Sequence, residues 1–271
     1  MSLPGVQNAT VRPKDLRRLI IEASHEAHVG HVASALSVCD LLSVLFSSIL
    51  RHPGTRRPDR DRIILSKGHA ALALYGALVL AGIHSRDRLH SYCKDGTLMG
   101  VHPEHTLEGV EISTGSLGLG LSIGVGMALA ARLDRAPERV FVLLSDAECN
   151  EGSVWEAVMF SGHHRLSNLV AIVEKNGMQA LGPTKDVIDQ GRLKEQWGSF
   201  GWEVLEVDGH NETQLQTSLE LPDGHDRPRL VLANTVPGKG VSFIENRLEW
   251  HYLPLSDFQA SQALREIARS P

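Results

Sequence analysis

The sequence has few cysteines and little excess charge, and both shortages argue against whole classes of protein. Its three cysteines, Cys39, Cys93 and Cys149, include no CxxC pair. An odd number of cysteines without metal-ligand spacing favours a reducing compartment over a disulfide framework. The formal net charge is −5 and there is no long basic run, which argues against nucleic acid as a partner.

Long hydrophobic runs are also scarce. Residues 1–15 contain no apolar core segment, and no run approaches the length of a membrane span. We therefore expect no membrane partner and a cytoplasmic location. Apolar residues make up 42% of the chain, enough for one large α/β domain or two small ones. Because no repeat, low-complexity tract or linker divides the sequence, we expect a single domain over residues 1–271.

What the chain does have is a strong βαβ pattern at residues 140–182. The continuous apolar run 140–144 is typical of a strand buried on both faces of a parallel sheet. A helical pattern follows at 152–166, and a second apolar run at 169–173 ends near Asn176. Because the carboxyl ends of parallel strands share one edge of a sheet, we expect Asp146 and Asn176 to be neighbours.

Asp146 and Asn176 carry the oxygen ligands that Mg²⁺ prefers. Magnesium takes six oxygens and usually draws several of them from phosphates and water. One carboxylate, one amide oxygen and a backbone carbonyl after Asn176 therefore predict a metal-bound, phosphorylated ligand. The alternative is that both residues merely cap turns.

The same alternation of patterns continues along the chain. Apolar spacing predicts helices at 13–26, 37–50, 71–81, 118–133, 212–219 and 256–269, and strands at 61–65, 202–207 and 229–235. A helix and turn at 193–200 are expected from the resemblance described below. This order predicts an α/β fold with a doubly wound, mostly parallel sheet flanked by helices.

Two other features invite a functional interpretation. The glycine-rich turn 109–118 opens a helix, where backbone N–H groups can cradle a phosphate. A dinucleotide fingerprint fits poorly, because no buried strand precedes these glycines and their spacing is not GxGxxG. His25, His28 and His31 could suggest zinc, but the first and third lie on different helix faces and no fourth ligand is evident.

Several of these segments together resemble the transketolase family. The matching stretches are GHVASALSVCDLL (30–42), SKGHAALALY (66–75), GVEISTGSLGLGLS (109–122), EGSVWEA (151–157), PGKGVSF (237–243) and EWH (249–251). The resemblance implies the thiamine diphosphate (ThDP)-binding fold, as its diphosphate-binding, PP-type domain. It also implies ThDP and Mg²⁺ as cofactors, with Ca²⁺ or Mn²⁺ as substitutes for the metal.

The resemblance assigns a role to each matching residue. It places the Mg²⁺ ligands at Asp146, Asn176 and the backbone carbonyl of Met178, and the histidines that serve the sugar donor at His31, His69 and His102. The residues that it places around the cofactor are His69, Gly115, Ser116, Leu117, Asp146, Ala147, Glu151, Asn176 and His251.

This chain departs from the family pattern at four positions. Ser145 and Ala147 flank Asp146 where glycines are usual, and Val32 and Ala33 replace a proline and a glycine after His31. Ala147 keeps its N–H for a diphosphate contact but loses access to positive φ. These departures support one alternative, a degenerate domain retained as a non-catalytic scaffold.

The resemblance covers the first of three family domains, and we expect the pyrimidine-binding and C-terminal domains to be absent from this chain. We therefore expect the N-terminal subunit of a split transketolase, with a separately encoded C-terminal subunit in an α₂β₂ assembly and Glu151 coupling the sites. The expected reaction transfers a two-carbon ketol unit from a ketose or ketose phosphate to an aldose. A 2-oxoacid dehydrogenase-like or carrier-loading subunit is the alternative within ThDP chemistry. The sequence does not name the sugars.

Overall fold

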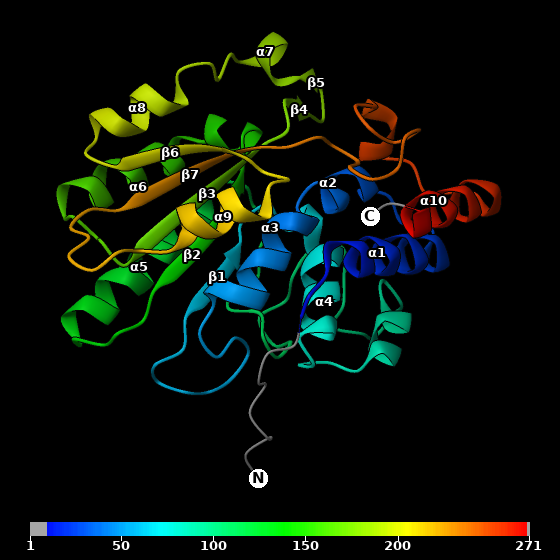
Figure 1. Ribbon diagram of the computed structural model, residues 1–271, viewed down its shortest axis with the longest axis horizontal. Coiled ribbons are helices and arrows are strands. Elements are labelled where there is room, and N and C mark those ends of the chain that lie inside the picture. Colours follow the sequence, from blue (N-terminus) through cyan, green and yellow to red (C-terminus); the bar gives the residue numbers. More distant parts are fainter. Residues whose placement is uncertain (1–9, 270–271) are drawn as a thin grey trace.

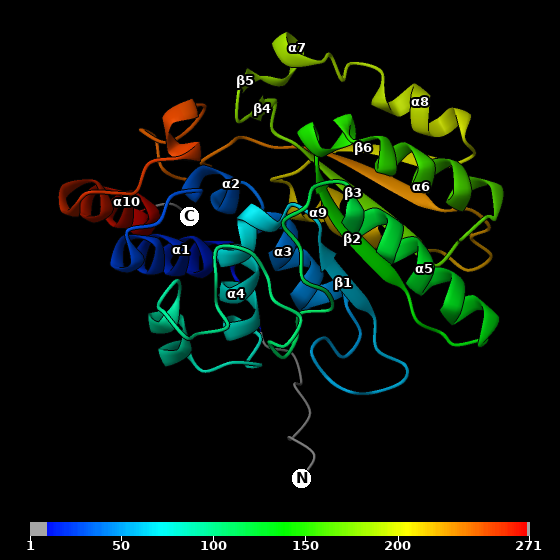
Figure 2. The ribbon, with the colours of Figure 1, turned by 180° about the vertical axis from the view of Figure 1, so that it is seen from behind.

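A five-stranded parallel sheet forms the centre of this computed structural model, which describes residues 10–269 (Figures 1 and 2). The strands lie in the order β1 (Arg62–Leu65), β2 (Val140–Ser145), β3 (Leu169–Lys175), β7 (Arg229–Asn234) and β6 (Glu203–Asp208). Each neighbouring pair is parallel. β2 is buried at every residue because helices cover both of its faces. The predicted doubly wound α/β fold is confirmed.

Helices form a layer on each face of the sheet. α5 (Leu119–Leu133) and α6 (Gly152–His163) cover one face (Figure 2), and α3 (Cys39–Val44) and α9 (Glu212–Leu219) cover the other (Figure 1). Beyond α3, three helices pack together as a further layer: α1 (Pro13–Ala27), α4 (Ala71–Leu80) and α10 (Asp257–Arg269). The shorter elements are α2 (Val32–Leu36), α7 (Thr184–Val187), α8 (Leu193–Ser199) and the antiparallel pair β4 (Met178–Gln179) and β5 (Gly182–Pro183).

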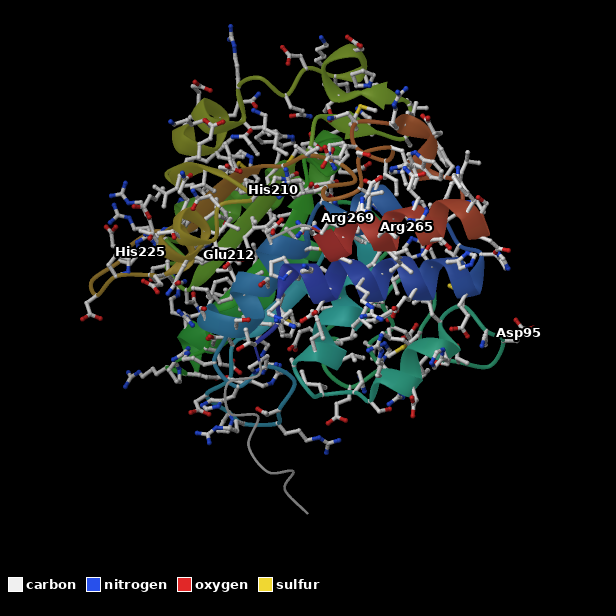
Figure 3. The ribbon with its side chains drawn as sticks, turned by 45° about the vertical axis from the view of Figure 1, so that its right-hand side comes forward. Asp95, His210, Glu212, His225, Arg265 and Arg269 are labelled. Carbon is white, nitrogen blue, oxygen red and sulfur yellow. The ribbon has the colours of Figure 1, made fainter. Side chains whose placement is uncertain are left out.

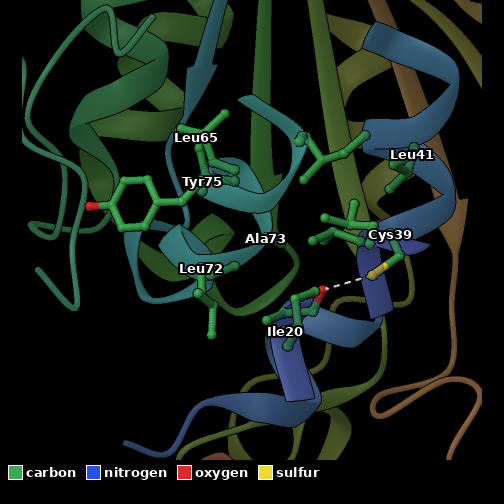
Figure 4. Close-up of a cluster of buried hydrophobic side chains, with 14 of the residues drawn as sticks. Ile20, Cys39, Leu41, Leu65, Leu72, Ala73 and Tyr75 are labelled. Carbon is green, nitrogen blue, oxygen red and sulfur yellow. Dashed lines mark hydrogen bonds between the residues drawn. The ribbon is translucent and has the colours of Figure 1, made fainter. Parts of the chain in front are cut away.

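Apolar side chains form a separate core on each face. In the core beside α1, Ile20, Cys39 and Leu41 pack with Leu72 and Tyr75 of α4 (Figure 4). The core under α5 and α6 includes three close aromatic rings, those of Trp155, Trp197 and Trp202. All three cysteines are free thiols. Burial raises the pKa of Cys39 to about 12 and that of Cys149 well above its usual value, so neither is a thiolate nucleophile at neutral pH.

The helix expected at 37–50 begins earlier than predicted. Helical structure starts at Val32, directly after His31, and continues through α2, α3 and a π-helical turn at Leu45–Ile49. Residues 32–46 are buried throughout, because α1 and α4 pack on one side and α9 on the other. A pattern of apolar residues on one face only therefore does not describe this helix, and it could not show where the helix begins.

The expectation that no apolar run approaches the length of a membrane span is wrong for this same stretch. Val32–Ile49 is long and apolar enough by composition, with a mean hydropathy of 1.9 over 18 residues. However, 89% of the stretch is buried inside the fold, where it serves as a core helix.

All five strands are parallel and end at one edge of the sheet, which we call the carboxyl-end rim. β1 leads into the turn Ser66, Lys67, Gly68, and β2 leads directly into Asp146. β3 leads into Asn176 and β7 into Thr235, and the register pairs Ser145 with Glu174 and Lys175 with Asn234. The rim therefore collects polar residues that are far apart in the sequence.

A buried polar network ties the outer helical layer to this rim. His210 lies in the loop after β6 (Figure 3). Its Nδ1 is 2.7 Å from Asp40 of α3, and the Val236 N–H donates to its Nε2 at 2.8 Å. Arg17 of α1 also donates to Asp40. Burial alone would raise the pKa of Asp40, but the contacts with His210 and Arg17 outweigh burial and lower it. The loop after β7 is thus fixed against α1 and α3.

Candidate active site

Asp146 and Asn176 meet at the carboxyl-end rim, as the βαβ pattern predicted. The Gly177 N–H donates to Asp146 Oδ2 at 2.9 Å, and the Met178 N–H donates to Asn176 Oδ1 at 2.9 Å. Both side-chain oxygens therefore accept from consecutive N–H groups of a single turn. The Thr184 hydroxyl also donates to Asp146 Oδ2 at 3.1 Å, which ties the start of α7 to the site.

The surroundings of the Asp146 carboxyl favour its neutral form. Its exposed fraction is 1%, and none of the salt bridges among the described residues includes it. Burial and the nearby negative charge of Glu174 raise the pKa of Asp146 to about 6, although N–H groups of Gly177 and Ala147 partly offset this. A divalent cation at this carboxylate would remove the cause of the shift.

A buried ion pair lies directly behind these two residues. Lys67 Nζ contacts Glu174 Oε2 at 2.7 Å, and neither side chain is exposed. Asn176 Nδ2 donates to the same oxygen at 3.1 Å, and the Thr235 hydroxyl donates to the other carboxylate oxygen. The sequence interpretation missed this pair. A charged residue within the SKGH match and another at the end of an apolar strand were the available signals.

Glu148 is a second buried acid that sequence reasoning missed. Its carboxylate accepts from the Gly118 N–H at 2.8 Å, from the Ser145 N–H at 3.2 Å and from the Ser66 hydroxyl. Burial raises its pKa despite these donors. The side chain holds three segments together: the turn after β1, the end of β2 and the start of α5.

The glycine-rich turn packs closely on the rim because it lacks side chains there. A Cβ on Gly68 would lie 2.8 Å from the Gly115 nitrogen, so the SKGH turn and the glycine-rich turn touch through their backbones. Gly118 has φ of +86°, and a Cβ there would lie 2.6 Å from Glu151 Cβ. Gly115 lies against the ring of His102, which a Cβ on that glycine would approach to 3.1 Å.

Three histidine rings form a cluster at the same rim. The ring centroids of His31, His69 and His251 lie 5.2 to 5.6 Å apart, although the residues come from three separate segments. His31 is the N-cap of α2, and its φ of +62° lies in the left-handed region. His25 and His28 do not join them, so the zinc interpretation of that trio has no support.

Burial keeps these rings neutral. It lowers the pKa of His69 to about 2 and that of His251 to about 4, with further lowering from Lys67 and the other histidines. The pKa of His31 is lowered by burial and by His102. Neutral imidazoles at pH 7 can accept protons or hydrogen bonds from hydroxyl groups.

The remaining predicted site residues differ in their exposure. Ser116, Leu117, Glu151 and His102 are exposed, and the Met178 backbone lies in β4 beside Asn176. The Ala147 N–H donates to Asp146 Oδ1 at 2.8 Å, so a diphosphate would share or replace that bond.

The chemistry of the rim fits a divalent cation and an anionic cofactor. No group of three or more His, Cys, Asp or Glu residues in the described chain is arranged to hold an ion by itself. Asp146 and Asn176 instead offer one carboxylate and one amide, which suits a metal that takes its other oxygens from a ligand. Four buried side-chain atoms have no hydrogen-bond partner within residues 10–269, and they include His31 Nδ1 and Gln179 Nε2.

A cavity of about 310 Å³ lies elsewhere, and none of the predicted site residues lines it. Its charged lining includes Arg56, Arg60, Glu108 and Glu111, and Arg60 already donates to Glu111. Geometry and chemistry therefore favour the rim over this cavity.

Comparison with known proteins agrees with the site. The family described as "Transketolase, thiamine diphosphate binding domain" matches residues 8–268. One subunit of a 6-deoxy-6-sulfo-D-fructose transketolase from Clostridium sp. (strain MSTE9) is 36% identical over 260 residues, which cover 94% of each chain. One subunit of an apulose-4-phosphate transketolase from Phocaeicola vulgatus is 35% identical, over 97% of this chain and 95% of its own.

Solved structures show the same fold. A transketolase from Pichia stipitis, solved as a complex with sedoheptulose-7-phosphate, superposes with a TM-score of 0.89 at 28% identity. The match covers 97% of this chain but only 41% of the Pichia chain, so this chain spans about two fifths of that protein. From the family match, these relatives and the fold, the chain belongs to the transketolase family, as its thiamine diphosphate-binding domain.

Proposed function

We propose that this chain is the N-terminal, ThDP-binding subunit of a split transketolase. It would transfer a two-carbon ketol unit from a ketose or ketose phosphate to an aldose, with ThDP and Mg²⁺. The observation that carries the proposal is the convergence of Asp146, Asn176 and three neutral histidines on one rim.

The rim residues divide into those for the metal and those for the cofactor. Asp146, Asn176 and the Met178 carbonyl would hold Mg²⁺, for which Ca²⁺ or Mn²⁺ would substitute. The residues that would surround ThDP are His69, Gly115, Ser116, Leu117, Ala147, Glu151 and His251. Among the buried polar atoms without a hydrogen-bond partner in residues 10–269, His31 Nδ1 and Gln179 Nε2 belong to or adjoin this set of residues, which supports a polar ligand there.

The histidines would act on the sugar. When bound, ThDP supplies the nucleophilic carbon for a ketose carbonyl and stores the electron pair from C–C cleavage. His31, His69 and His102 would orient the donor hydroxyls and hold or accept their protons. The lowered pKa values of His31 and His69 support this role, because a neutral imidazole has a free lone pair at pH 7.

A separately encoded C-terminal subunit would complete the site. The relatives named as transketolase subunits support this proposal, since this chain matches 94% and 95% of their lengths. Large apolar side chains are exposed along the glycine-rich turn, the segment after β4 and the loop after His251: Leu117, Leu119, Leu181, Ile188, Tyr252 and Leu253. Such a surface suits an obligate partner in an α₂β₂ assembly, with Glu151 at the contact between sites.

The names of the relatives support a chemical class of substrate and not a particular sugar. The two relatives are named for 6-deoxy-6-sulfo-D-fructose and for apulose-4-phosphate, both of which carry an anionic group, so we propose an anionic ketose as donor. We place the reaction in the cytoplasm, with no nucleic acid or membrane as partner. A 2-oxoacid dehydrogenase-like or carrier-loading reaction is less favoured, because several histidines at the rim suit a polyhydroxylated donor.

Reconstitution tests the proposal. The chain, its candidate partner protein, ThDP and Mg²⁺ would be mixed and assayed for ketol transfer with a panel of ketose donors and aldose acceptors. Ketol transfer that requires both proteins is the expected result. Tight ThDP and Mg²⁺ binding by the assembled complex, without turnover of any donor, would instead support the scaffold alternative.

A further inference from the structure

The buried ion pair between Lys67 and Glu174 has no role in the function proposed above. Both side chains are fully buried, with 2.7 Å between Lys67 Nζ and Glu174 Oε2. Removing two charges from water costs several kcal/mol per ion, and apolar replacements of a buried pair are often neutral or stabilising. Stability alone therefore does not account for this pair beside a proposed metal site.

The contacts of Glu174 define which way the Asn176 amide faces. An ionised carboxylate only accepts hydrogen bonds, so the group 3.1 Å from Glu174 Oε2 must be the amide nitrogen of Asn176. On the other side, the Met178 N–H donates to Asn176 Oδ1 at 2.9 Å. The amide oxygen is thereby turned toward the same turn whose Gly177 N–H donates to Asp146.

We propose that Glu174 is a positioning residue that orients the Asn176 amide so that its oxygen faces the bound metal ion. Lys67 is the counter-ion that balances the Glu174 charge. The proposal rests on the proposed function, because it assumes a metal at Asp146 and Asn176. A flipped amide would present an NH₂ group, which repels a cation and cannot coordinate it.

Residues that follow two other strands hold the Glu174 carboxylate in place. Lys67 follows β1, and the Thr235 hydroxyl, after β7, donates to Glu174 Oε1. The orientation of Asn176 thus depends on three strand ends, which places the ligand oxygen before any metal arrives. Preorganised ligands of this kind typically lose about 10–100-fold in metal affinity when the group behind them is removed.

Two charge-balanced double variants test the role of the acceptor oxygen. Lys67→Met with Glu174→Leu removes both charges and the acceptor, whereas Lys67→Met with Glu174→Gln keeps an amide oxygen at that position. Binding of Mn²⁺ to the two-subunit complex with saturating ThDP would be measured from the electron paramagnetic resonance signal of free Mn²⁺. We expect the Leu variant to raise the Mn²⁺ dissociation constant by about 10–100-fold, and the Gln variant to recover most of that loss.

Two single variants that keep the Lys67–Glu174 ion pair serve as comparisons. Thr235→Val keeps the ion pair but removes one hydroxyl that holds Glu174, and we expect the dissociation constant to increase by about threefold. Glu111→Gln weakens a largely buried ion pair with Arg60 at the opposite end of β1, and it should leave Mn²⁺ affinity unchanged.

The outcomes separate this inference from the proposed function. If the wild-type complex shows no ThDP-dependent Mn²⁺ binding, the proposed function fails and the positioning role with it. If the wild type binds but the folded Leu variant, checked by its thermal unfolding midpoint, binds within twofold, only the positioning role is refuted. Equal losses in the Leu and Gln variants would also refute it, because a purely structural pair would not distinguish an acceptor oxygen from a methyl group.

Discussion

Two buried aspartates at opposite ends of the central sheet, Asp61 and Asp146, have their charges compensated in different ways. At the amino ends of β1 and β2, Asp61 is fully buried and accepts from Arg51 at 2.7 Å and from Arg139 at 2.5 Å. Burial alone would raise the pKa of Asp61, but the arginine hydrogen bonds outweigh it and lower the pKa. At the carboxyl-end rim, burial and Glu174 raise the pKa of Asp146 to about 6.

The difference lies in what compensates each charge. Asp61 is matched by two guanidinium groups, whereas Asp146 and Glu148 are held by N–H and hydroxyl donors and form no ion pair within residues 10–269. A matched cluster stabilises the fold, and an unmatched one favours the binding of a cation. We therefore expect mutations at the amino end to change stability and mutations at the rim to change ligand binding.

The largest effect is expected at the amino end. Asp61→Ala leaves Arg51 and Arg139 close together without their shared counter-charge, and we expect the free energy of unfolding to fall by about 3 kcal/mol. Urea denaturation followed by circular dichroism measures this. The matched control is Asp59→Ala, which removes an exposed acid from the same loop and should leave the midpoint unchanged. A clear loss of metal affinity in Asp61→Ala would contradict the expectation that mutations at the amino end change stability and not ligand binding.

The next effect is on binding at the rim. Asp146→Ala removes the only carboxylate proposed to touch the metal, so ThDP affinity that depends on Mg²⁺ should fall by more than about 100-fold, beyond the range typical of groups behind a ligand. Isothermal titration of the two-subunit complex measures it. Asp186→Ala, at an exposed acid of α7, serves as the control. Unchanged affinity in Asp146→Ala would refute the metal assignment.

A tenfold effect is expected from pH. A carboxyl with a pKa of about 6 is protonated below that pH and must lose its proton to bind a metal. Mn²⁺ affinity should thus be constant at about pH 7–8 and fall about tenfold per unit below about pH 6. His69 and His251, with pKa values of about 2 and 4, do not titrate in this window. Affinity that stays flat down to about pH 5 would show that Asp146 is not the titrating ligand.

The smallest effect concerns the stability of the metal-free chain. A raised carboxyl pKa means that the folded state binds a proton more tightly than the unfolded state, so its stability decreases as the pH rises from about 4 to 6. Asp146→Asn removes the charge but also weakens the bonds from Gly177 and Thr184. We expect a gain of about 1 kcal/mol at about pH 8 and none at about pH 4. Urea unfolding at both values tests the sign, and a loss of stability at the higher pH would contradict it.

The sequence predicted that Asp146 and Asn176 lie at the carboxyl-end rim, because the pattern of each strand and its end is contained in a short stretch of chain. Buried strands read as apolar runs, and parallel connections bring their carboxyl ends to one edge, so Asp146 and Asn176 were expected as neighbours. Short or wholly buried elements were harder. The two-residue strands β4 and β5 have no periodicity to detect, and the helix after His31 is buried all round and therefore carries no amphipathic stripe.

The contacts of the buried charges were beyond the sequence for a different reason. Ser66 and Glu148 are 82 positions apart, and Lys67 and Glu174 are 107 apart, so their pairing depends on how separate turns pack. The same holds for His251, which joins His31 and His69 only through the loop after β7. Family resemblance indicated the histidines, whereas the only local signal for Glu174 was a charged residue at the end of an apolar strand, and no signal gave its partner or singled out Glu148.

The sequence by itself determined the order of helices and strands, the parallel sheet and the family, because apolar periodicity and motif spacing are properties of the linear chain. Only the tertiary structure decided which charges are matched and which are left for a ligand. The physical reason is that the pKa of a carboxyl depends on burial and on neighbours within a few ångströms. Asp61 and Asp146 are the same residue type at opposite ends of one sheet, and only packing makes one of them an anchor and the other a candidate metal ligand.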